Sequence, residues 1–102
     1  MNVSDGLLVI HEFDGAVLAA QIGLVVERLK ADDIDPASVD VRQMAGEAIR
    51  RDLLAQLADR GVQFDGGTMF SLAGGFLSMS FQLGHDRDLL MVKSFVENWM
   101  PS

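Results

Sequence analysis

The feature that most constrains the fold is an uncharged stretch that runs from Gly66 to Gly84. Gly74-Gly75 suits a two-residue hairpin turn, because glycine tolerates the positive φ angles that primed turns require. The flanking residues then pair outward from the turn, and side chains alternate between two faces. One face is apolar and the other carries mostly serines; the apolar face consists of Phe70, Leu72, Leu77, Met79 and Phe81. The sequence therefore predicts a β-hairpin over residues 68–83 with one face buried.

A transmembrane helix is the alternative for the same stretch, whose length is close to the roughly 20 residues that a bilayer needs. About half of the stretch is Gly, Ser, Thr or Gln, and Asp65 and Asp86 bound it instead of orienting Lys or Arg residues. Met1 to Asp5 contain no basic residue of the kind that begins a signal peptide. We therefore expect no membrane span, no signal peptide and a cytoplasmic location.

Composition indicates a single domain with more apolar residues than its interior needs. The chain has 102 residues, of which 49% are hydrophobic, and no cysteine. A domain of this size has limited interior volume, so we expect part of the apolar surface to lie in an interface, with a homodimer as the assembly. The absence of cysteine excludes disulfides, thiol catalysis and thiolate metal sites, and it is compatible with a reducing cytoplasm.

The charge of the chain favours one class of partner over others. Its formal net charge is −7, and Arg50-Arg51 is the only basic doublet. Nucleic-acid binding requires a basic stripe, and anionic membranes attract basic segments, so direct binding to either is not expected. A protein partner with a basic surface is the expected alternative.

Two segments before residue 40 are expected to be regular. Residues 7–13 read as a strand that is apolar on both faces, which indicates the middle of a sheet or an interface. Residues 16–31 have helical periodicity, with apolar residues that extend well beyond one stripe. We therefore expect this helix to be sandwiched between other elements.

Two further helices follow. Asp40 is expected to be the N-cap of a helix that ends at Gly61, with Met44 among its inward residues and Glu47 and Arg51 as a surface ion pair. The last helix is expected to begin near Asp86. The resulting order is β-α-α-β-β-α. The sequence thus predicts one α+β domain over residues 1–102, in which a small antiparallel sheet with a central hairpin packs against helices.

No segment matches a catalytic or metal-binding motif. The densest polar cluster is His85 to Asp88, and its only distant partners for a metal or acid–base site would be His11, Glu12 and Asp14. The same cluster is typical of a helix N-terminus. The serines lack a nucleophile elbow, and the glycines lack a phosphate-loop pattern. We expect no catalytic residue, no metal and no cofactor.

These observations favour a non-enzymatic function. We expect a small acidic protein-binding module, such as an inhibitor, an immunity-type or an adaptor protein of bacterial or phage origin, that occupies a surface of a larger macromolecule. The expected partner-binding residues are Asp32, Asp33, Asp35, Leu90, Met91, Phe95 and Trp99. Two alternatives remain open. One is a small dimeric enzyme or ligand-binding domain that uses His11, His85 and nearby acids; the other is a secretion-type chaperone with a nonpolar client groove.

Overall fold

The computed structural model describes residues 7–101, so that the predicted absence of a signal peptide at Met1 to Asp5 concerns residues outside the described part. The elements are β1 (Leu8–Glu12), α1 (Gly15–Ala31), α2 (Val41–Asp59), β2 (Met69–Ser71), β3 (Ser78–Gln82) and α3 (Leu89–Asn98). Short 3₁₀ helices lie at Pro36–Ser38, Ala73–Gly75 and Asp86–Asp88. The predicted α+β class and the order β-α-α-β-β-α are confirmed.

The hairpin has the predicted register. Phe70 lies opposite Met79, with Met69 opposite Ser80 and Ser71 opposite Ser78. Gly74 and Gly75 have φ angles of +70° and +84°, as the turn requires. The apolar face is turned inward: Leu77, Met79 and Phe81 are buried, whereas the serines of the other face are more exposed.

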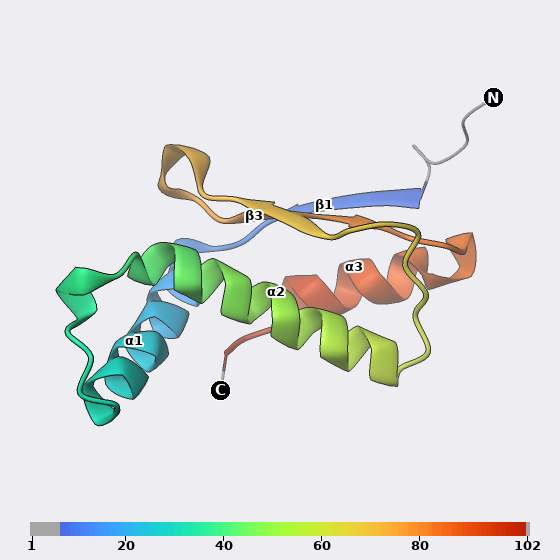
Figure 1. The fold of residues 1–102 in the computed structure, drawn as a ribbon. Helices are drawn as coiled ribbons and strands as arrows, with labels where there is room; N and C mark the ends of the chain where they lie inside the picture. Colours follow the sequence, from blue (N-terminus) through green and yellow to red (C-terminus); the bar gives the residue numbers. More distant parts are fainter. Residues whose placement is uncertain (1–6, 102) are drawn as a thin grey trace.

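β1 does not lie in the middle of the sheet, which was one of the two positions expected for it. The strand order is β1-β3-β2 and all pairs are antiparallel, so that β3 occupies the middle and β1 an edge (Figure 1). Val9 is buried on the inner face, but Ile10 on the outer face is 68% exposed. A strand that is apolar on both faces does not have to be central, because its second apolar face can remain uncovered.

The core lies between the inner face of the sheet and a layer formed by α2 and α3 (Figure 1). On α2, Ile49, Leu53 and Leu57 are fully buried. The helix ends in a Schellman motif, in which the N–H of Val62 donates to the carbonyl of Leu57 and Gly61 has a φ of +84°. The predicted caps of this helix, Asp40 and Gly61, are confirmed, and Asp40 accepts a hydrogen bond from the N–H of Gln43.

The expectation that the first helix is sandwiched is wrong. α1 packs mainly against α2 and projects to one side of the sheet (Figure 1). Only Val17, Leu18 and Leu29 of this helix are buried. The sheet is too short to reach beneath α1, so that much of the apolar surface of the helix has no second layer to cover it.

A candidate binding groove between α1 and α2

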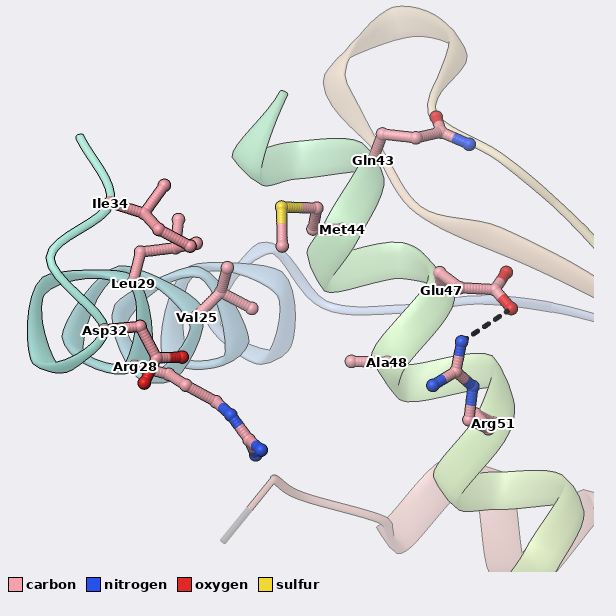
Figure 2. Close-up of a pocket in the computed structure, with 10 residues that line it drawn as sticks. All are labelled: Val25, Arg28, Leu29, Asp32, Ile34, Gln43, Met44, Glu47, Ala48 and Arg51. Carbon is pink, nitrogen blue, oxygen red and sulfur yellow. Dashed lines mark ion pairs between the residues drawn. The ribbon is translucent and has the colours of Figure 1, made fainter. Parts of the chain in front are cut away.

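A groove opens between α1 and the N-terminal half of α2. Its volume is about 610 Å³. Figure 2 shows that α1 and the loop after it form one wall, whereas α2 forms the other. The lining residues are Val25, Arg28, Leu29, Asp32, Ile34, Gln43, Met44, Glu47, Ala48 and Arg51.

The floor of the groove is apolar because the chain reverses sharply after α1. The N–H of Ile34 donates to the carbonyl of Leu29 (2.8 Å), and the N–H of Asp33 donates to the carbonyl of Lys30 (3.1 Å). This is a Schellman motif with Asp33 in the left-handed position, at a φ of +59°. The motif folds Ile34 back toward Leu29, and both side chains line the groove (Figure 2).

The opposite wall contains a residue that was expected in the core. Met44 was predicted to point inward, but its side chain is 40% exposed and lines the groove, as Ile34 does at 41%. The prediction was wrong because the sheet covers the inward side of α2 only from about Ala45 onward, whereas Met44 lines the groove beside α1. A long apolar side chain is therefore held at the surface of the groove by a well-capped helix.

The acidic loop beside the groove contains carboxylates of two kinds. Asp35 accepts a hydrogen bond from the N–H of Ala37 and caps the short 3₁₀ helix there. In residues 7–101 no hydrogen bond or ion pair engages the carboxylates of Asp32 and Asp33, and both residues are exposed. These two charges are consequently available at the rim of the groove.

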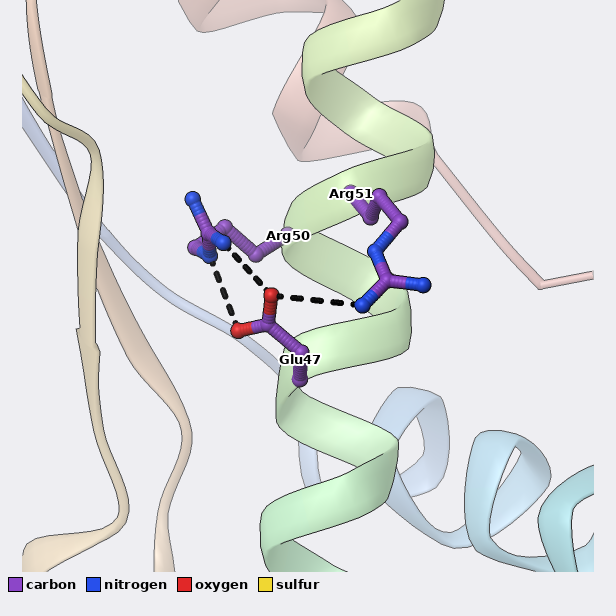
Figure 3. Close-up of polar contacts among 3 residues, drawn as sticks. All are labelled: Glu47, Arg50 and Arg51. Atoms are coloured by element: carbon purple, nitrogen blue, oxygen red, sulfur yellow. Dashed lines mark hydrogen bonds and ion pairs between the residues drawn. The ribbon is translucent and has the colours of Figure 1, made fainter.

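Glu47, which lines the groove, binds two arginines of α2, Arg50 and Arg51 (Figure 3). The predicted pair of Glu47 with Arg51 is present at 3.7 Å, but the closer partner is Arg50, whose Nε donates to a carboxylate oxygen of Glu47 (3.0 Å). The hydrogen bond from Arg50 lowers the pKa of Glu47 and raises that of the Arg50 guanidinium. Arg28, which also lines the groove, has no ion-pair partner within the described residues.

The structure divides the predicted partner-binding residues between two places. Asp32, Asp33 and Asp35 lie beside the groove, whereas the other four lie on or next to α3, and Trp99 lines a separate pocket with Ala16 and Val17 at the start of α1. The α3 group is Leu90, Met91, Phe95 and Trp99. Only Leu90 is largely exposed, at 79%; Met91 and Phe95 pack against the core, and Trp99 is buried.

The two histidines are not brought together. His11 pairs with Met79 toward one end of the β1–β3 ladder, where its ring contacts that of Phe13 edge-on at 4.6 Å. His85 follows the other end of β3, and its Nε2 lies 2.7 Å from the side-chain oxygen of Gln63. Within residues 7–101 no three His, Asp or Glu side chains are grouped so that they could hold a metal ion.

The predicted acidic residues lie beside the groove, but the sequence analysis did not predict the apolar floor. The available signal was the excess of apolar residues on α1, which was attributed to burial on both sides of that helix. On this helix Leu29 is buried, but Val25 is only partly buried and lines the groove. The open side of α1 could not be located without knowing that the sheet does not reach it.

The chain matches no protein-family model, no curated protein and no solved structure. Among the helices of residues 7–101, none has both the length and the apolarity that crossing a bilayer requires. The geometry of the groove is therefore the basis on which a function is proposed.

Proposed function

We propose that this protein is a small acidic protein-binding module whose α1–α2 groove receives an apolar segment of a larger protein. The observation that carries the proposal is the groove itself, an apolar floor bordered by charged residues and formed by two helices with well-defined ends. Binding sites for an amphipathic helix have this character, because the apolar side of the ligand enters the groove and its polar side meets the rim. An inhibitor, an immunity-type or an adaptor protein of bacterial or phage origin would act in this way.

Charge suggests the composition of the ligand. The chain carries a formal net charge of −7, and Asp32 and Asp33 stand unengaged beside the groove. A ligand helix with basic residues next to its apolar face would meet these carboxylates, and long-range attraction would speed its association. We further propose that the protein acts in the cytoplasm as a homodimer, in which the groove of each copy remains open.

The groove also favours one of the alternatives, a secretion-type chaperone, because such a protein needs a nonpolar surface for its client. The two functions differ in the state of the ligand. A chaperone binds its client before the client folds, whereas the proposed module binds a segment displayed by a folded protein. Competition separates them: a reduced, unfolded model protein displaces a groove-bound peptide from a chaperone but not from the module.

The test uses three fluorescent amphipathic helices with the same apolar face and with basic, neutral or acidic polar faces. We expect the basic helix to bind most tightly. Met44→Lys places a charge on the α2 wall of the groove and should weaken binding of this helix by about tenfold or more. Leu90→Lys makes the same kind of change at an exposed site on α3 and is the matched control. Equal binding by wild type and Met44→Lys, with Leu90→Lys also unchanged, would contradict the proposal.

A second arm addresses charge and the enzyme alternative. Asp32→Lys combined with Asp33→Lys should slow association of the basic helix, and added salt should reduce the difference from wild type. His11→Ala and His85→Ala should leave binding unchanged, since neither histidine lines the groove. If both histidine variants folded but no longer bound the helix, the result would favour the alternative, an enzyme or ligand-binding domain that uses His11 and His85.

A further inference from the structure

The outer edge of β1 exposes main-chain hydrogen-bonding groups in a regular pattern. The N–H of Phe13 donates to the carbonyl of Leu77 (2.8 Å), and the N–H of Leu83 donates to the carbonyl of Leu7 (3.0 Å). Antiparallel ladders alternate, so the odd-numbered residues of β1 bond to β3 and the even-numbered ones point away from it. The main-chain N–H and C=O groups of Leu8, Ile10 and Glu12 therefore point away from β3, toward the open edge of the sheet.

Nothing in the described part of the chain blocks this edge. The sheet ends at β1, and apart from β3 no strand of residues 7–101 pairs with it. The five residues of β1 include no proline and no lysine, which are the usual protections of an edge strand. The side chains of Leu8 and Ile10 stand on the outer face of the sheet, where the adjacent residues of β3 are the uncharged Gln82 and Ser80.

We propose that β1 pairs antiparallel with β1 of a second copy, with Ile10 opposite Ile10, so that two three-stranded sheets join into one. This inference rests on the homodimer of the proposed function and identifies its interface. In this register every outward N–H and C=O of β1 finds a partner. Ile10 is 68% exposed in the single chain and would gain a β-branched neighbour across the two-fold axis.

This register keeps the two Glu12 carboxylates apart. Leu8 of each copy lies opposite Glu12 of the other, so that the two carboxylates stand at opposite ends of the paired strands. Sliding the strands one way shortens the overlap and, after two steps, brings Glu12 opposite Glu12, which is unfavourable because two carboxylates would face each other. Sliding them the other way shortens the overlap and leaves Glu12 unpaired.

The helical layer is compatible with the same arrangement. α3 packs beneath β1, so that joining the sheets would bring the α3 helices of the two copies side by side and antiparallel. Phe95 faces the α2 side, where its ring lies under the guanidinium of Arg60 (4.7 Å). Lys93 lies roughly 200° around the helix from Phe95, and Glu97 follows it by one turn. The flank toward the second copy therefore carries both signs of charge.

The first experiment measures the mass of the protein in solution. Wild type should sediment at twice 11.1 kDa. Ile10→Lys places two lysines opposite each other and should raise the dissociation constant of the dimer by about tenfold or more. Met69→Lys is the matched control, because Met69 is 70% exposed on the same outer face but lies on β2. Dissociation by Ile10→Lys alone supports pairing at the β1 edge.

A third variant tests the register. Leu8→Lys should preserve or tighten the dimer, because the new lysine would lie opposite Glu12 of the second copy. A wild type of 11.1 kDa at all concentrations would overturn both the interface and the homodimer. A dimer that survives Ile10→Lys, or that Met69→Lys also dissociates, would overturn the interface alone. Peptide binding in the groove is measured separately, so these failures are distinct from failure of the proposed groove function.

Discussion

The two ends of α2 lie in different surroundings. Beyond Ala45 the helix packs on the sheet and lies beside α3 in the same layer, and Ile49, Leu53 and Leu57 have no exposed surface. At its N-terminal end the neighbour is α1, and Met44 remains 40% exposed in the groove. One continuous helix thus serves as scaffold at one end and as a wall of the candidate binding site at the other. The difference shows that the exposure of an apolar side chain on α2 depends on whether the sheet covers that part of the helix.

The largest expected effect on stability comes from truncating a core side chain of α2, with a truncation in the groove for comparison. Leu53→Ala should lower the free energy of unfolding by about 2–5 kcal/mol, because it leaves a cavity in a packed core. Met44→Ala should lower it by less than about 1 kcal/mol, since the side chain is already partly in water. Urea unfolding followed by circular dichroism measures both. Equal losses would mean that the groove is as closely packed as the core.

Two glycines sharpen the comparison at an intermediate level. A Cβ on Gly46 would lie 2.6 Å from the ring of Phe70, so Gly46→Ala should cost about 1–2 kcal/mol despite the better helix propensity of alanine. Gly23, on α1, has no atom within 4 Å of the same position, so Gly23→Ala should stabilise the protein by up to about 1 kcal/mol. Thermal unfolding measures both variants. If Gly46→Ala and Gly23→Ala shifted the melting temperature in the same direction, the close packing at Gly46 and the open space at Gly23 would be wrongly assigned.

The smallest expected effect concerns Glu47 at the edge of the groove. Hydrogen bonding from Arg50 lowers the pKa of Glu47 below its ordinary value of 4.5. A lowered pKa in the folded state means that the pair stabilises the protein above about pH 4.5, and that this contribution is lost as the pH falls through the lowered pKa. Because the two side chains are 28% and 35% exposed, solvent screens the pair, and Glu47→Gln should cost only about 0.3–0.5 kcal/mol at pH 7. Unfolding measured at pH 7 and pH 3 should show a smaller difference between variant and wild type at the lower pH.

The hairpin could be predicted because two local signals agree. The Gly74-Gly75 turn and the alternation of apolar residues determine the same register, and both depend only on neighbours in sequence. The edge position of β1 and the open side of α1 could not be predicted in this way, because both depend on how far the sheet extends. For the same reason the exposed acidic loop could be predicted from its local pattern, whereas Met44 was assigned to the core.

The central claim is that the α1–α2 groove binds an apolar segment of a protein partner. Nuclear magnetic resonance of the labelled chain, titrated with the basic amphipathic helix, tests it residue by residue. The account predicts saturable shifts of the methyl signals of Val25, Leu29, Ile34 and Met44, with those of Leu53 and Leu90 nearly unchanged. Shifts centred on Leu90, or no saturable shift in the groove, would contradict it.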